Sequence, residues 1–254
     1  MLSEIPAYII NLRKDVKKRE HMDRLCKKYN LNYHFIDAVY GKELSDNEID
    51  EVYNLKDSIK HCRRALTKGE IGCALSHLKI YRYMVENNIQ QAIIFEDDIE
   101  IKDGFDDVVG SLEILPKDWE LVLLGYLPNF KIYKKSQKKI NNDFSIVRFA
   151  NVVFGLHAYL INLKGAKRLL NQLTTIAEPI DHYTGDSKYI NLYGVYPEVV
   201  GLDVVCAQQS NLALERSQEI KVKLPIYNIV ARELFVKPYN NYIKIFTTPR
   251  SYKK

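Results

Sequence analysis

The sequence lacks any apolar run of about 18 or more residues, so a membrane-spanning helix is not expected. Its first residues, 1–6, include Glu4 and lack the basic segment followed by an apolar one that marks a secretory signal. It also lacks a P-loop, a GxGxxG string and a GxSxG string, which argues against kinases, nucleotide-dependent dehydrogenases and serine hydrolases. We therefore expect a cytoplasmic protein with a different kind of site.

Cysteine is scarce and scattered: Cys26, Cys62, Cys73 and Cys206 form no CxxC pair. Reduced, mostly buried thiols are expected rather than a disulfide framework or a zinc site. No internal repeat and no Gly/Ser-rich linker divides the 254 residues, of which 46% are hydrophobic and 27% charged. This length and composition suit one soluble globular domain with a short appendage at most.

The candidate appendage is the segment 225–254, where basic and aromatic residues alternate and Glu233 is the single acid. Its basic residues are Arg232, Lys237, Lys244, Arg250, Lys253 and Lys254. Such a tail suits an anionic membrane surface, where each Lys or Arg contributes about 1 kcal/mol. A solvated C-terminus is the alternative. Nucleic acid is not expected as a partner, since no zinc finger, recognition helix or stacked-aromatic platform occurs. We expect a domain over 1–224 and a basic, aromatic tail over 225–254.

Hydrophobic periodicity predicts alternating strands and helices. Alternating or continuous apolar runs predict strands at 6–12, 33–38, 91–95, 119–124 and 152–161, with 195–205 extended. Apolar residues at helical spacing predict helices at 15–29, 69–87, 105–115, 164–173 and 182–192. The segment 41–66 is polar and poorly periodic, with a possible short helix capped by Ser45 or Asp46. This order predicts an α/β fold with a mostly parallel sheet covered by helices on both faces.

Three adjacent acids, Glu96, Asp97 and Asp98, follow the buried strand 91–95. In open α/β sheets, ligands bind outside the carboxyl ends of the strands. Carboxylate oxygens suit Mg²⁺ or Mn²⁺, which also bridge substrate phosphates. If the segment stays extended, Glu96 and Asp98 point to one side and Asp97 to the other. A solvated acidic turn that caps the next helix is the alternative.

Six strings occur in order along most of the chain, over residues 6–210. They are Tyr8–Arg13 followed by Arg19, Phe35–Ala38 with Gly41, Leu66–His77 (LTKGEIGCALSH), Ile93–Asp98 (IIFEDD), Gly155–Tyr159 with Gly165 and Ala166, and Pro179–Asp181. Together they resemble glycosyltransferase family 25, the family of lipopolysaccharide β-1,4-galactosyltransferases and of relatives that act on collagen. The chain departs from the family pattern at Phe95 and at 182–186 (HYTGD). The acceptor and the linkage therefore stay open.

The resemblance implies the GT-A fold, a UDP-sugar donor, Mn²⁺ or Mg²⁺, and transfer with inversion to a glycan or lipooligosaccharide acceptor. The metal is expected at Glu96, Asp98 and His157, with Asp98 as the direct ligand. Residues expected to bind the donor are Asn11, Arg13, Gly69, Gly72, Ser76, His77, Glu96 and Asp97. Asp181 is the first candidate for the general base that deprotonates the acceptor hydroxyl, and Asp186 is the second.

Each assignment has a structural alternative. Arg13 can form a surface salt bridge, His77 and His157 can be hydrogen-bonded packing residues, and the two aspartates can cap a helix. The donor can also be UDP-glucose or UDP-N-acetylglucosamine. A two-metal phosphoesterase would need a second set of Asp and His ligands, which is not evident. A carbohydrate-binding or membrane-surface-binding module would bind sugar without metal dependence and would leave the acid cluster without a purpose.

Overall fold

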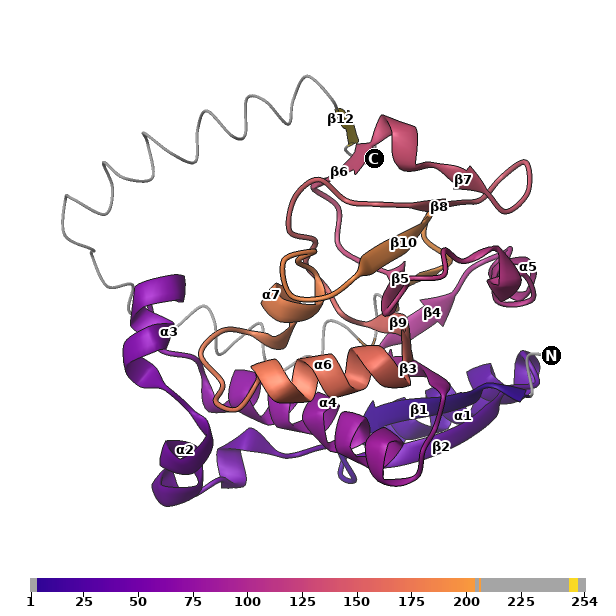
Figure 1. Ribbon diagram of the computed structural model, residues 1–254. Coiled ribbons are helices and arrows are strands. Elements are labelled where there is room, and N and C mark those ends of the chain that lie inside the picture. The colour runs from indigo at the N-terminus through magenta and orange to yellow at the C-terminus, as the bar shows by residue number, and fades with distance from the viewer. Residues whose placement is uncertain (1–3, 204–205, 207–246, 251–254) are drawn as a thin grey trace, which may run out of the picture.

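The computed structural model describes residues 4–203, 206 and 247–250 (Figure 1). Its strands are β1 (Pro6–Asn11), β2 (Asn32–Asp37), β3 (Gln91–Glu96), β4 (Ile99–Ile101), β5 (Leu121–Gly125), β6 (Phe130–Tyr133), β7 (Lys138–Lys139), β8 (Ser145–Val147), β9 (Ala158–Asn162), β10 (Leu192–Tyr196), β11 (Val200–Leu202) and β12 (Thr247–Arg250). Its α-helices are α1 (Val16–Lys28), α2 (Asp46–Val52), α3 (Leu55–Cys62), α4 (Lys68–Glu86), α5 (Phe105–Val109), α6 (Leu163–Gln172) and α7 (Ile180–Thr184).

The main sheet has the order β2-β1-β3-β9-β5-β10-β8-β7. β1 pairs in parallel with β2 and β3, and β10 pairs in parallel with β5. β9 lies antiparallel between β3 and β5, and β8 lies antiparallel to β10. Only β9 and β8 therefore run against the other strands of this sheet. The expected α/β fold with a mostly parallel sheet is confirmed.

Helices cover both faces of the sheet, which makes two cores (Figure 1). On one face α4 and α6 pack over the strands, and Ile94 of β3 belongs to this core. On the other face α1 and α5 pack, and Ile93 and Phe95 of β3 belong to that core. Neighbouring strand residues point to opposite faces, so a strand covered on both sides has to be apolar at every position. This explains the continuous apolar run at 92–95.

Helix α4 begins at Lys68, one residue before the predicted start. Thr67 is the N-cap, and a capping box with Glu70 closes the first turn. The Glu70 carboxylate also accepts two hydrogen bonds of 2.7 Å from Arg64. Further along the helix, a side chain at Gly72 would lie 2.7 Å from the backbone nitrogen of Gly41, so glycine is required there for close packing.

Several predicted elements were wrong or incomplete. The helix expected at 182–192 is only the short α7, because the helix ends at Gly185, which packs against the Val153 carbonyl, and because β10 begins at Leu192. The strand expected at 152–161 begins at Ala158, after a loop in which Gly155 has φ of +85°. The helix expected at 105–115 ends at Val109, before a 3-10 turn over Leu112–Ile114. The polar segment 41–66 contains α3 as well as the Ser45-capped α2.

Two small sheets flank the main one: β4 pairs with β11, and β6 pairs with β12. β12 belongs to the predicted tail 225–254, and the tail's other residues lie outside the described ones. The division into 1–224 and 225–254 therefore stays a prediction. Among the described helices, none is long and apolar enough to cross a membrane.

Candidate active site at the carboxyl edge of the sheet

Strands β1 and β3 bring polar residues to one edge of the sheet. Asn11 ends β1 and Glu96 ends β3. Because β9 is antiparallel to them, its beginning lies at the same edge, and the Glu96 amide donates to the His157 carbonyl at 2.9 Å. The predicted position of the acids, outside the carboxyl ends of the strands, agrees with this arrangement.

The chain turns immediately after Glu96, so Asp97 and Asp98 do not continue the strand. Lys18 of α1 lies 2.9 Å from Asp97 Oδ1 and 3.4 Å from Asp98 Oδ2. Asn11 Nδ2 donates to the other oxygen of Asp97 at 2.8 Å. The extended segment that would point Asp97 and Asp98 to opposite sides is therefore absent, and both aspartates contact Lys18. We call residues 96–98 the acid turn.

Burial sets the charges in the acid turn. Burial, together with the nearby charge of Glu96, raises the pKa of Asp98 to about 6 although Lys18 opposes the shift. Burial also raises the pKa of Asp97, again against Lys18. Burial alone would lower the pKa of Lys18, but the two aspartates overcome this and raise it above its usual range. Near neutral pH, three carboxylates therefore face one ammonium group, and the acid turn keeps a net negative charge.

Glu96 lies against a buried chain of aromatic residues. His77 Nε2 lies 3.7 Å from Glu96 Oε1, and His77 Nδ1 lies 2.8 Å from the Tyr159 hydroxyl. Tyr159 is in turn 2.8 Å from the Tyr81 hydroxyl. Burial would raise the pKa of Glu96, but the contact with His77 lowers it overall. His77 is thus buried beside Glu96, and 31% of the Glu96 side chain stays exposed.

Several buried polar atoms near this edge have no hydrogen-bond partner within the described part of the chain: Asn11 Oδ1, Asp98 Oδ1, His77 Nε2 and His157 Nε2. Buried polar atoms usually find a partner, so unpaired ones are common where a ligand binds. Two of the four are oxygens, the donors that Mg²⁺ and Mn²⁺ prefer. The acid turn therefore fits a hard divalent cation.

The three residues expected to hold the metal do not converge as a set. Donor atoms of His, Cys, Asp and Glu come within 4.8 Å of one another in three groups among the described residues, and none contains Glu96, Asp98 and His157 together. His157 packs closely against Gly125 and the Val200 carbonyl, and burial lowers its pKa. This arrangement favours the packing interpretation of His157.

The eight residues expected to bind the donor fall into three sets. Asn11, His77, Glu96 and Asp97 lie together at the edge. Gly72 and Ser76 belong to the packing of α4, since Ser76 Oγ accepts from the Val39 amide at 2.8 Å and donates to the Gly72 carbonyl at 2.7 Å.

The other two predicted donor-binding residues lie at the surface or at a helix end. Arg13 is 83% exposed and pairs with Asp37 at 2.5 Å, which is the predicted alternative of a surface salt bridge. Gly69 lies in the first turn of α4.

The two candidate bases have different surroundings. Asp181 Oδ2 accepts from the Gly155 amide at 3.2 Å, which ties α7 to the loop that leads to His157. Asp186 Oδ1 accepts from the Lys188 amide at 2.9 Å and so caps a turn. Neither contact involves the acid turn, so the roles of Asp181 and Asp186 stay predictions.

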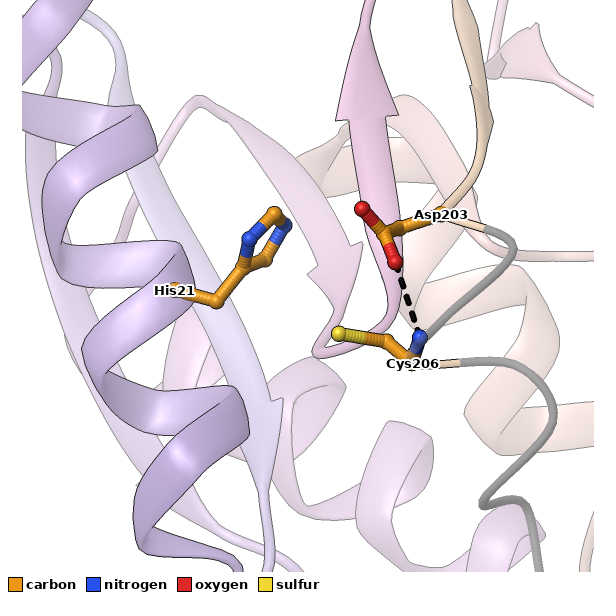
Figure 2. Close-up of side chains that lie close together, drawn as sticks. All are labelled: His21, Asp203 and Cys206. Carbon is orange, nitrogen blue, oxygen red and sulfur yellow. Dashed lines mark hydrogen bonds between the residues drawn. The ribbon is translucent and has the colours of Figure 1, made fainter.

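Lys18 is the main residue that our sequence analysis missed. It lies four residues before the buried Met22 on the same face of α1, and a lysine on a buried helical face signals a buried acidic partner. A second missed group lies beside the acid turn, where His21 of α1 faces Asp203 and Cys206 (Figure 2). The Asp203 amide donates to the Asp98 carbonyl at 2.8 Å, which joins this group to the acid turn.

Comparison with known proteins gives one family. Residues 4–184 match the family model described as "Glycosyltransferase family 25 (LPS biosynthesis protein)". The chain is 32% identical over 188 residues to procollagen galactosyltransferase 1-A of Xenopus laevis. The aligned region covers 68% of this chain and 28% of the frog protein. It is 30% identical over 179 residues to a glycosyltransferase 25 family member of Drosophila melanogaster, with the same two shares. The chain thus spans less than a third of the length of these relatives.

Among solved structures, the chain is similar to A197 from STIV, with a TM-score of 0.36 and 11% identity over 77% of this chain and 83% of that one. It is also similar to a glycosyltransferase involved in the glycosylation of the major capsid of PBCV-1, with a TM-score of 0.33 and 6% identity over 66% and 67%.

Proposed function

Because the chain belongs to glycosyltransferase family 25, we propose that it transfers a hexose, galactose from UDP-galactose in the first place, to a hydroxyl group of a lipopolysaccharide or lipooligosaccharide glycan. The relatives named as galactosyltransferases support the donor, and the family description supports the acceptor. The observation that carries the proposal is the acid turn at the carboxyl edge of the sheet, where the unpaired buried Asp98 Oδ1 accompanies a net negative charge.

Asp98 and Glu96 are the proposed ligands of a Mn²⁺ or Mg²⁺ ion. Asp98 Oδ1 is buried and unpaired, and Glu96 is partly exposed, so neither has to break a hydrogen bond within the described residues to bind a cation through these atoms. When bound, the ion neutralises charge on the donor diphosphate and on the departing UDP. His157, the third ligand predicted from the sequence, is not included in this proposed pair, because it packs tightly against Gly125.

The remaining residues of the edge position these ligands. Lys18 holds the carboxylates of Asp97 and Asp98 from one side, and Asn11 fixes the second oxygen of Asp97. His77 holds Glu96 from the α4 side. The prediction that Arg13 binds the donor diphosphate requires that its exposed salt bridge with Asp37 opens.

Asp181 is the proposed general base. Inversion requires that the acceptor hydroxyl attacks the anomeric carbon opposite the departing UDP, while a carboxylate takes the hydroxyl proton. The hydrogen bond from the Gly155 amide holds Asp181 Oδ2 and leaves the second carboxylate oxygen for the acceptor. Asp186 stays the second candidate.

The test is release of UDP from a panel of UDP-sugars, with and without Mn²⁺, by the wild type and by Asp98→Asn. Asp143→Asn is the matched control, because Asp143 is exposed and lies 45 residues after Asp98 in the sequence. We expect Mn²⁺-dependent turnover of one UDP-sugar, lost in Asp98→Asn and kept in Asp143→Asn. Turnover of UDP-glucose alone, or of UDP-N-acetylglucosamine alone, would identify that sugar nucleotide as the donor in place of UDP-galactose. Binding of a sugar without any turnover would favour a non-catalytic carbohydrate-binding module instead.

The cytoplasmic face of the inner membrane is the proposed location, with the basic, aromatic tail 225–254 as the peripheral contact. Co-sedimentation with anionic and with neutral vesicles tests this part. We expect binding to anionic vesicles alone, weakened by salt; equal binding to neutral vesicles, or none to either, would exclude it.

A further inference from the structure

Four side chains of types that can bind metal lie close to one another near the end of α3 and the start of α7, outside the acid turn. His61 and Cys62 end α3, and Glu178 and His182 lie one helical turn apart before and within α7. We propose that these four residues bind one zinc ion. The proposal does not depend on the transferase activity, and it revises the expectation that the scattered cysteines form no zinc site.

Three of the four side chains, Cys62, Glu178 and His182, bring donor atoms within 4.8 Å of one another, and His61 lies outside that group but contacts Glu178. His182 Nδ1 lies 3.0 Å from one carboxylate oxygen of Glu178, and His61 Nδ1 lies 3.2 Å from the other. Two nitrogen or oxygen donors at about 2.0–2.1 Å from a tetrahedral zinc ion are separated by about 3.3 Å. In a tetrahedral site with a zinc–sulfur bond of about 2.3 Å, the sulfur lies about 3.5 Å from the other donors, so Cys62 Sγ has to approach by at most about 1.3 Å.

The chemistry of the four donors is that of zinc rather than of Mg²⁺ or Mn²⁺. Imidazole nitrogen and thiolate sulfur are preferred by zinc, and one thiolate with one carboxylate neutralises a divalent ion. On binding, the Cys62 thiol releases its proton to solvent, and each neutral imidazole carries its single proton on Nε2. Burial and the charge of Glu178 raise the pKa of the Cys62 thiol to about 11, and a bound cation reverses this effect.

The backbone already holds the two halves of the cluster together. The Ile176 amide donates to the Val52 carbonyl at 2.7 Å, and the Asn54 amide donates to the Ile176 carbonyl at 2.8 Å. The segment before α3 and the segment before Glu178 are thus fixed side by side, so little ordering is needed to form the site. Zinc there would stiffen the start of α7, which also carries Asp181.

The two other donor groups are less suited to zinc. In the group of Figure 2, His21 Nε2 is already bonded to the Ile99 carbonyl at 2.8 Å, and Asp203 accepts from the Cys206 amide. In the group of Cys73, His77 and Glu96, the histidine is held by Tyr159. Each of these groups contains one cysteine, which makes it possible to tell the three apart by experiment.

The experiment uses Co²⁺ as a spectroscopic substitute for zinc on the full chain, stripped of metal by a chelator and kept in excess Mg²⁺ to fill the acid turn. A cobalt–thiolate bond gives charge-transfer absorption in the near ultraviolet. We expect one equivalent of Co²⁺ to give this band and Zn²⁺ to abolish it. Cys62→Ser should lose the band, whereas Cys73→Ser and Cys206→Ser should keep it.

Loss of the band in Cys73→Ser or Cys206→Ser instead, or its survival in Cys62→Ser, would overturn the proposal. So would its absence from wild-type protein that circular dichroism shows to be folded. If Cys62→Ser does not fold, His61→Ala gives the same information, because His61 is at the surface. This variant should fold and should bind Zn²⁺ about tenfold or more weakly; unchanged affinity would count against the site.

Discussion

Replacing Lys18 by methionine should strengthen metal binding at the acid turn. The substitution keeps the apolar part of the side chain and removes the charge. Lys18 is 12% exposed and contacts both aspartates, so it competes with any cation for the same negative charge. Without metal, the variant should be less stable by about 3 kcal/mol, because two buried carboxylates lose their partner.

The structure sets the size of the gain in affinity. An ion bound at about 2.1 Å from the unpaired Asp98 Oδ1 lies roughly 6–7 Å from Lys18 Nζ, given that Nζ is 3.4 Å from Oδ2. Repulsion between a divalent ion and an ammonium group at this distance is about 5 kcal/mol at an effective dielectric constant of about 20 and about 1.3 kcal/mol at about 80. The lower value alone corresponds to about ninefold tighter binding.

Titration of Mn²⁺ by electron paramagnetic resonance at about pH 8, where Asp98 is ionised, measures the dissociation constant directly. Lys17→Met is the matched control, since Lys17 is the exposed neighbour on the same helix. We expect Lys18→Met to bind Mn²⁺ at least about ninefold more tightly and Lys17→Met to match the wild type. Equal or weaker binding in Lys18→Met would refute the competition between Lys18 and the metal.

Three further outcomes are expected. Mn²⁺ affinity should fall by about tenfold per pH unit below about pH 6, because the raised pKa of Asp98 leaves its carboxyl protonated there. An affinity that does not change between pH 5 and pH 7 would contradict this. Gly72→Ala should lower the free energy of unfolding in urea by about 1–3 kcal/mol, because its new methyl group meets the Gly41 backbone; an unchanged midpoint would show that α4 can shift. Asp181→Asn should reduce kcat by about a hundredfold or more with little change in donor affinity, whereas Asp186→Asn should stay within a few fold, and the reverse order would exchange the two roles.

The sequence predicted the elements whose pattern is strong and local. The helix predicted at 69–87 agrees with α4 within a residue at each end, since its apolar face lies within the segment. The strands at 6–12 and 91–95 were found for the same reason. The short length of α7 was not predicted, because the backbone contact of Gly185 with Val153 and the start of β10 override the local helical pattern.

The site was predicted in part. The acid turn was placed at the correct edge because a buried strand leads directly into Glu96. The orientation of the Asp97 and Asp98 side chains was not predicted, since it depends on a turn and on Lys18, which lies nearly 80 residues earlier in the sequence. Pairings across such distances follow from the tertiary fold and leave no signal in local spacing, apart from a lysine on a buried helical face.

The position of β9 affects the order in which the chain is assembled during synthesis. β9 is a five-residue strand at 158–162 that separates β3 from β5. Neither β3 nor β5 can therefore pair with its neighbour β9 until this later segment has been synthesised. The unit β1–α1–β2 with β3 can pair once residue 96 has emerged, but its β3 edge then stays open over the next 60 or so residues. An open apolar edge invites pairing with other chains. A nascent chain stopped before residue 158 is therefore expected to aggregate, and completion of β9 closes that route.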